Sequence, residues 1–116
     1  MLQNLKLLFN FPLPILGGPL KDARWFWGSG GTSYLLGTYE RETCNVFQNL
    51  VKKGDVVFDI GAHVGFYTLL SAKCVGRGGV VYAFEPLDRN VGFLKKHVRL
   101  NKCKNVIILD VAVSDK

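Results

Sequence analysis

Three short segments of almost wholly apolar residues stand in the second part of the chain, and they constrain its fold more than any other feature. They are residues 56–60, 80–84 and 106–109. Strands that alternate polar and apolar residues face water on one side, whereas strands that are apolar throughout are typical of a parallel sheet covered on both faces. We therefore expect three strands of a buried parallel sheet.

Helical patterns precede and separate these segments. Apolar residues recur at helical spacing over residues 39–51 and 65–75, and again from Asp88, which is expected to cap its helix, to about Leu100. The apolar positions of the first helix are Val46, Phe47, Leu50 and Val51. Because parallel strands need long right-handed crossovers, this order predicts an α/β fold. We expect the first half of a Rossmann-like doubly wound parallel sheet, with three strands and their crossover helices.

Residues 1–38 differ from the rest, since they are rich in Gly, Pro and aromatic side chains. This composition predicts an irregular region of turns and short strands, with a β-hairpin around the glycine cluster and the tryptophans as packing anchors. Residues 1–20 are apolar, but no uninterrupted run reaches the roughly 18 residues of a membrane helix, so we expect a peripheral helix or arm. The chain is therefore divided into an N-terminal arm, residues 1–38, and a partial Rossmann-like domain, residues 39–116.

The turn after the first apolar segment carries the most informative motif. It reads Asp59-Ile60-Gly61-Ala62-His63-Val64-Gly65. In doubly wound sheets the ligand lies beyond the carboxyl ends of the strands, which is where this turn falls. Gly61 permits a tight turn and lets a ligand approach the backbone, and Gly65 permits close packing at the helix start. Asp59 can orient the loop or accept a hydrogen bond from a ligand amine.

The same turn bears on the choice of cofactor. A pyrophosphate favours bare amides at a helix N-terminus, and the adjacent carboxylate of Asp59 would repel it. The Gly-x-x-x-Gly spacing of Gly61 and Gly65 also differs from the Gly-x-Gly-x-x-Gly of dinucleotide folds, which disfavours an NAD-dependent oxidoreductase. S-adenosylmethionine carries an ammonium, a carboxylate and a sulfonium but no phosphate, so we predict it as the cofactor.

A second acidic residue stands at the end of the next apolar segment. Glu85, followed by Pro86, lies 24 residues after Gly61, close to the offset of about 20 residues at which an acid binds ribose hydroxyls in nucleotide-binding folds. One carboxylate can accept hydrogen bonds from both hydroxyls. The alternative is a structural acid at a helix N-terminus, favoured by the helix dipole.

Two more acids follow the third apolar segment. Loops in this position usually flank the adenine, so Asp110 or Asp115 is a candidate to accept a hydrogen bond from the adenine amine. Val111 or Ala112 is a candidate to contact the ring. The alternative is that either acid is an ordinary loop residue.

Six stretches of the chain, taken in order, resemble the FkbM family of methyltransferases. They are residues 37–40 (GTYE), 53–62 (KGDVVFDIGA), 65–68 (GFYT), 81–86 (VYAFEP), 89–90 (RN) and 112–115 (AVSD). The resemblance covers about residues 37–116. It implies a class I methyltransferase fold that transfers a methyl group from S-adenosylmethionine, typically to a hydroxyl oxygen, so the implied acceptor is a hydroxyl-bearing small molecule or glycan.

On that resemblance, Asp59, Gly61 and Gly65 belong to the cofactor loop and Glu85 to the ribose site. The other residues predicted to bind the cofactor are Ala62, His63, Tyr67, Pro86, Asp110 and Ala112. His63 departs from the Asn that the family usually shows, and its imidazole either bonds the cofactor or the loop, or is a satisfied structural side chain. Neither His63 nor Tyr67 is a convincing general base, so the catalytic base is not identified.

Family members continue with further strands, whereas this chain ends at Lys116, just past the third apolar segment. The first strand, which is central in the family, would then have an open edge. An exposed apolar edge promotes pairing between chains. We therefore expect a truncated product, a fragment or half of a split protein, with pairing through the open sheet edge as one outcome.

The charge of the chain leaves other classes of function open. The formal net charge is +6, and basic residues gather in residues 89–104. A basic helix is able to bind nucleic acid, but a solvated helix face is the ordinary interpretation, and no strong nucleic-acid signal accompanies it. The alternatives to a methyltransferase are a non-catalytic, cofactor-binding remnant and a nucleic-acid-binding domain that uses this basic helix.

The three cysteines, Cys44, Cys74 and Cys103, are widely spaced, and neither His63 nor His97 shows metal-ligand spacing with them. An odd number without a pattern argues against both a disulfide framework and a zinc site. Free thiols indicate a reducing compartment, and we therefore predict a cytoplasmic location.

Overall fold

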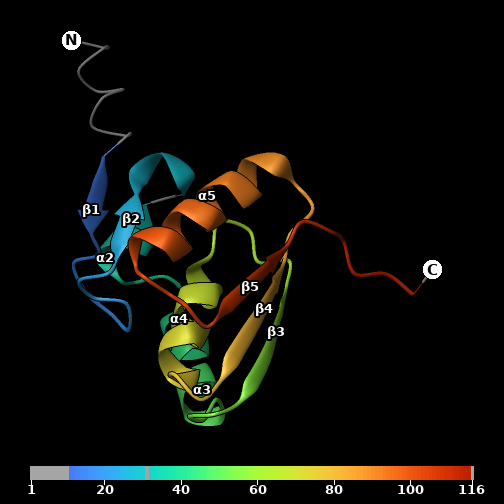
Figure 1. The fold of residues 1–116 in the computed structure, drawn as a ribbon. Helices are drawn as coiled ribbons and strands as arrows, with labels where there is room; N and C mark the ends of the chain where they lie inside the picture. The colour runs from blue at the N-terminus through green and yellow to red at the C-terminus, as the bar shows by residue number, and fades with distance from the viewer. Residues whose placement is uncertain (1–10, 31, 116) are drawn as a thin grey trace.

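The structure, a computed structural model, describes residues 11–30 and 32–115. A small N-terminal hairpin packs beside a three-stranded parallel sheet and its helices (Figure 1). In chain order the elements are β1 (Pro12–Pro14), β2 (Arg24–Phe26), the 3-10 helix η1 (Trp27–Ser29), α2 (Thr32–Leu36), α3 (Arg41–Leu50), β3 (Val56–Ile60), α4 (Phe66–Val75), β4 (Val80–Phe84), α5 (Asp88–Leu100) and β5 (Val106–Leu109). None of the described helices is long and apolar enough to span a membrane. Of the arm predicted over residues 1–20, residues 1–10 lie outside the described part of the chain.

Strands β3, β4 and β5 form a parallel sheet in that order, and their bounds match the three apolar segments. Val57 of β3 pairs with Val81 of β4, which pairs with Val106 of β5. Both crossovers, through α4 and through α5, step in the same direction across the sheet. Because such crossovers are right-handed, the two helices lie on the same face, as Figure 1 shows. The predicted Rossmann-like α/β fold is confirmed.

The other face of the sheet is bare among the described residues. Val56, Phe58 and Ile60 of β3 are 58%, 64% and 62% exposed, whereas Val81 and Ala83 on the covered face of β4 are fully buried. Within the described residues the outer edge of β3 also has no neighbouring strand. Strands that are apolar on both sides suit a sheet with two covering layers, and the described helices provide one.

Helix α3 meets the core on a different side from the one predicted. Val46 and Leu50 are 57% and 72% exposed, so their assignment to an apolar packed face is wrong. Cys44 is the buried residue instead, and the ring of Phe47 lies 5.5 Å from that of Tyr67 on α4, measured between centroids. The helix touches the core along a narrow strip, and apolar spacing alone does not identify that strip.

The predicted hairpin is present, with β1 and β2 paired antiparallel, but its turn lies in residues 15–23. The later glycines, Gly28 and Gly30, belong instead to η1 and its end. A Cβ on Gly37 would collide with the backbone of Gly17, so the turn and the segment before α3 approach each other backbone to backbone. This approach requires glycine and docks the hairpin on the rest of the molecule.

The hairpin and helix α4 share one hydrophobic core. Leu20 and Trp25 are buried in the same cluster as Phe66 and Leu70 of α4. Trp25 is therefore a packing anchor, as predicted, whereas Trp27 is 38% exposed. The predicted boundary between an arm and an α/β domain falls within this continuous core, and it stays a prediction.

His97 of α5 joins the hairpin to the loop that follows β3. Its ring stacks on Trp25 with 3.9 Å between centroids, and its Nε2 accepts a 3.1 Å hydrogen bond from the amide of Phe26. The proton then lies on Nδ1, which donates to the carbonyl of Val64 at 2.7 Å. Burial lowers the pKa of His97 to about 4. The charge of Lys96 also lowers this pKa, whereas the hydrogen bond to Val64 opposes the shift. The buried ring is therefore neutral at neutral pH.

Acid should unfold the protein partly through His97. Its ordinary pKa is 6.5 and its folded pKa about 4, so the unfolded state binds more protons between these values and stability is lost as the pH falls. The free energy of unfolding should drop by about 3 kcal/mol from this residue. Urea unfolding at several pH values measures it, and the His97→Gln variant should show a shallower loss. Equal losses in the two proteins would contradict the assignment.

Candidate cofactor site

The loop between β3 and α4 lies against the carboxyl ends of two strands. The amides of Gly61 and Ala62 both donate to the carbonyl of Phe84 at the end of β4, each at 2.9 Å. Gly61, His63 and Gly65 have positive φ angles of 73°, 52° and 107°. The backbone thus fixes the loop at the edge of the sheet where the sequence predicted a ligand.

The two glycines of this loop serve different needs. Gly65 lies against α5, where a Cβ would be 2.7 Å from Cδ1 of Leu94, so a side chain here would displace the buried side chain of Leu94. Gly61 has no heavy atom within 4 Å of the position that a Cβ would take. Open space beside a glycine gives a ligand access to the backbone. Gly65 therefore permits the close packing predicted for it, whereas the approach of a ligand to Gly61 stays a prediction.

His63 occupies a left-handed backbone position. Asn, Asp and His are enriched among the non-glycine residues that adopt this conformation, which explains how His can stand where Asn is usual. Its side chain is exposed, and its amide donates to Oε1 of Glu85 at 2.9 Å. His63 contributes to the loop through its backbone, and a contact between its imidazole and the cofactor stays a prediction.

The carboxylate of Glu85 joins the loop to the start of α5. β4 ends at Phe84, so Glu85 is the first residue after the strand and not its last. Its Oε2 accepts hydrogen bonds from the amide of Leu87 at 3.0 Å and from Nδ2 of Asn90 at 3.4 Å. Burial by itself would raise the pKa of Glu85, but the bonds from Leu87, His63 and Asn90 outweigh it and lower the pKa. Glu85 is therefore ionised at neutral pH.

These bonds limit what Glu85 can offer a ribose. A carboxylate has about four acceptor positions, and the protein uses three of them. One position is left for a hydroxyl, so bonds to both hydroxyls would need the long bond from Asn90 to give way. Glu85 is 2% exposed. Glu85 therefore holds the loop by hydrogen bonds, and its contact with a ribose stays a prediction.

Helix α5 begins without the cap that the sequence predicted. Asp88 is its first helical residue, Leu87 stands at the capping position, and no side chain caps the helix. Asn90 in the first turn bonds Glu85 instead. The sequence analysis did not predict that Asn90 bonds Glu85. The one signal for this bond was an amide side chain five residues after the acid.

Asp59 lies near the end of β3, beside the loop. Its Oδ2 accepts a 2.6 Å hydrogen bond from Oγ1 of Thr68, a fully buried residue of α4. Burial raises the pKa of Asp59, the bond from Thr68 and the nearby His63 oppose this rise, and the charge of Glu85 adds to it. Two carboxylates therefore flank the loop and affect each other. Thr68 orients one of them, a role that no sequence motif indicated.

Three other predicted site residues are placed less directly. The hydroxyl of Tyr67 donates to Oε2 of Glu40 just before α3, and burial raises the pKa of Tyr67, so its phenol is a poor general base. The side chain of Ala62 is buried with Ala83, which leaves its backbone to face a ligand. Pro86 is exposed. Contacts of these residues with a cofactor stay predictions.

The segment after β5 leaves the sheet at the carboxyl ends of the strands. Residues 110–115 are exposed and irregular, and Figure 1 shows them running away from the sheet. Asp110 directly follows Leu109, whose carbonyl accepts a 3.1 Å hydrogen bond from the amide of Glu85, so Asp110 stands at the same end of the sheet as the loop. An adenine contact from Asp110, Asp115 or Ala112 stays a prediction.

The gathered groups suit S-adenosylmethionine better than a phosphate-bearing cofactor. Asp59 and Glu85 would repel a pyrophosphate, whereas an ammonium and ribose hydroxyls are donors that carboxylates accept from. The three cysteines are free thiols. Within residues 11–30 and 32–115, no three His, Cys, Asp or Glu side chains are grouped to hold a metal ion.

The comparison with protein families decides the class. The family model of the TRM5/TYW2 methyltransferase domain matches residues 36–115. The chain belongs to the TRM5/TYW2 methyltransferase domain family. The matched residues contain the loop, both flanking carboxylates and all three parallel strands. No curated protein matches the chain.

Solved structures share this fold. A SAM-dependent methyltransferase from Aquifex aeolicus is 28% identical, with a TM-score of 0.58, over 72% of this chain and 43% of its own. A protein from Clostridium thermocellum described as an rRNA methylase is 26% identical, with a TM-score of 0.58, over 61% of this chain and 39% of its own. A protein-L-isoaspartate O-methyltransferase is 25% identical, with a TM-score of 0.56, over 60% and 23%. The chain spans less than half the length of each of these structures.

These matches confirm two predictions, the class I methyltransferase fold and S-adenosylmethionine as the cofactor of the family. They do not extend to the FkbM family, so that resemblance holds at the level of the methyltransferase class. The stretches that carried it include the cofactor loop and the acid after β4. A cofactor-binding segment of this kind does not by itself separate one methyltransferase family from another.

Alanine at Gly65 should destabilise the protein more than alanine at Gly54. Both positions have positive φ, so both variants carry backbone strain of about 1–2 kcal/mol. A Cβ at Gly54 meets nothing within 4 Å, whereas one at Gly65 meets Leu94, which should add about 1–3 kcal/mol. Chemical unfolding of the two variants measures the difference. Equal destabilisation would show that the loop does not need this close approach to α5.

Proposed function

We propose that the protein transfers a methyl group from S-adenosylmethionine, with the cofactor on the loop between β3 and α4. The observation that carries the proposal is the open, positive-φ Gly61 between the carboxylates of Asp59 and Glu85. Membership in a methyltransferase domain family supports the same activity. S-adenosylmethionine, when bound, supplies an electrophilic methyl carbon.

The described residues have binding and orienting roles in this proposal. Asp59, held by Thr68, would accept a hydrogen bond from the ammonium, and Glu85 would accept one from a ribose hydroxyl. Gly61 leaves its backbone open to the ligand. Methyl transfer needs the acceptor about 3–3.5 Å from the methyl carbon and in line with sulfur, so positioning supplies much of the rate. Tyr67 is bonded to Glu40 and is not assigned as a base.

Neutralising Glu85 should weaken cofactor binding. Glu85→Gln keeps an oxygen acceptor for the loop but removes a charge-assisted hydrogen bond of about 1.5–3 kcal/mol. We expect the Kd for S-adenosylhomocysteine, measured by isothermal titration calorimetry, to rise about 10- to 100-fold. The matched control is Asp88→Asn, which removes a nearby exposed carboxylate that does not bond the loop. This control should bind like the unchanged protein.

Two results would count against this site. A folded protein that gives no heat with millimolar S-adenosylhomocysteine would overturn the site as a whole. If the Glu85→Gln and Asp88→Asn variants bind S-adenosylhomocysteine equally tightly, Glu85 is not part of the cofactor site, although the loop can still be.

For the acceptor we propose RNA. Two solved structures with this fold are described as rRNA methylases, and one of them is 26% identical to this chain. The net charge of +6 favours association with a polyanion. This proposal replaces the small molecule as the first candidate acceptor.

A hydroxyl group on a small molecule or glycan is the second candidate. It rests on the FkbM resemblance, in which residues 37–40 are the first matching stretch. Glu40 of this stretch bonds Tyr67 on the first turn of α4, next to the cofactor loop. The GTYE stretch therefore borders the proposed site, where it can help to select an acceptor.

A transfer assay with methyl-labelled S-adenosylmethionine separates these candidates. We expect label to enter ribosomal RNA transcribed in vitro, which carries no modification, and not a mixture of glycans. Glu85→Gln should lower incorporation and Asp88→Asn should not. Label in glycans alone would support the second candidate. No label in either, with S-adenosylhomocysteine still bound, would indicate a cofactor-binding remnant.

A further inference from the structure

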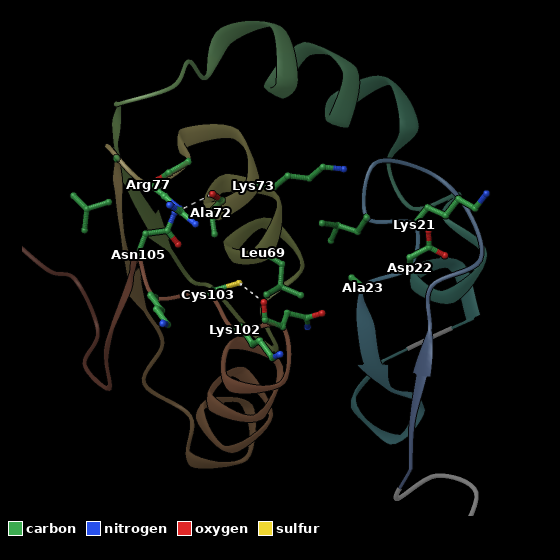
Figure 2. A pocket seen from close by; sticks show the side chains of 16 residues that line it. Lys21, Asp22, Ala23, Leu69, Ala72, Lys73, Arg77, Lys102, Cys103 and Asn105 are labelled. Carbon is green, nitrogen blue, oxygen red and sulfur yellow. Dashed lines mark hydrogen bonds between the residues drawn. The ribbon is translucent and has the colours of Figure 1, made fainter.

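A second concave surface lies at the opposite end of the sheet from the cofactor loop. It is lined by residues 20–23 of the hairpin turn, by the last turns of α4 with the α4–β4 connection, and by residues 101–105 before β5 (Figure 2). Its volume is about 1130 Å³, and it is open to solvent. The amino-terminal ends of β4 and β5 reach this groove, whereas the proposed cofactor site lies at their carboxyl ends.

The groove is strongly basic. Five of its sixteen lining residues are Lys or Arg and one, Asp22, is acidic. The basic residues are Lys21, Lys73, Arg77, Lys102 and Lys104. A neighbouring hollow shares Lys102 and Lys104 and adds Lys95 and Arg99, so the basic surface continues along α5. Seven of the fifteen Lys and Arg residues of the chain thus line one continuous surface.

Part of this charge has a structural purpose. Lys73 donates to the carbonyl of Pro19 at 2.7 Å, which links α4 to the hairpin turn. Lys73 and Arg77 also lie near the C-terminal end of α4, where cations offset the helix dipole. The helix end itself is satisfied by Asn105, whose amide donates to the carbonyls of Ala72 and Gly76. Neither purpose explains Lys21, Lys102 or Lys104, all of which are exposed.

The chemistry of the lining indicates which polyanion the groove would take. No Phe, Tyr or Trp is among the residues that line it, so bases have no ring to stack on. Binding would then rely on phosphate contacts from Lys and Arg, which do not depend on base sequence. A surface of this kind suits the backbone of a nucleic acid better than its bases.

We propose that this groove binds the phosphate backbone of the RNA acceptor, away from the nucleotide that is methylated. The inference rests on the proposed function, because it takes RNA as the substrate. β4 has five residues, so the groove and the cofactor loop are separated by about 17 Å of strand. Contacts this far from the reacting atoms stabilise bound substrate and transition state alike, so they should lower KM and leave kcat unchanged.

A charge reversal tests the groove directly. Lys21→Glu with Lys104→Glu changes two exposed lining residues, and Arg41→Glu with Lys96→Glu makes the same change in net charge outside the groove. Fluorescence anisotropy with a labelled ribosomal RNA hairpin should show about fivefold or more weaker binding for the groove variant at 0.15 M salt. The magnitude of the slope of log affinity against log salt should also fall by about 1.4–1.8, since two phosphate contacts are lost. The control variant should change both quantities much less.

Kinetics and cofactor binding separate this proposal from the proposed function. In the transfer assay the groove variant should raise KM for RNA with kcat unchanged, and its Kd for S-adenosylhomocysteine should match that of the unchanged protein. Equal loss of RNA affinity in both charge variants would overturn the groove, because general charge would explain it. Tighter binding to vesicles with anionic lipid than to RNA would overturn it in favour of a membrane surface. Absence of methyl transfer with RNA binding intact would overturn the proposed function alone.

Discussion

The hydrogen bonds that Glu85 accepts from the amides of His63 and Leu87 are the constraint on which the rest of the site depends. They join the loop after β3 to the start of α5, so that the ends of two neighbouring strands hold each other in place. A buried carboxylate without such partners would be costly, so the shape of the loop and the ionised state of Glu85 depend on each other. Gly65, at the other end of the loop, leaves room for the buried side chain of Leu94 on α5.

The strands and the acids that follow them were predictable because local sequence determines them. Apolar runs mark β3, β4 and β5, and Glu85 and Gly61 stand at fixed places relative to their ends. The errors arose where tertiary contacts decide. Leu50 is exposed although its spacing is helical, and Asp88 begins α5 without capping it. Thr68 and Asn90 orient the two carboxylates through contacts across the fold, which no linear motif records.

Charge is divided between the two ends of the sheet. Asp59 and Glu85 stand where β3 and β4 finish, whereas the groove at the other end is lined by Lys and Arg. A polyanion would be repelled from the first end and attracted to the second. This division would help an RNA acceptor to bind. The target nucleotide must enter an acidic site, and the phosphates of its neighbours are repelled there. Attraction at a distance from the chemistry offsets that local repulsion.

Solvent already reaches more than half of each side chain of Val56, Phe58 and Ile60. These side chains therefore contribute little to the free energy of unfolding of the helices and strands described. Exchange of Val56 or Ile60 for a polar residue would leave this segment's own packing intact, whereas Phe58 also contacts the rings of Tyr82 and Phe84. The same exchange would destabilise the contact between β3 and any layer of protein that packs on it. Tolerance to substitution at Val56 and Ile60 would consequently report on any such layer and not on the fold beneath it.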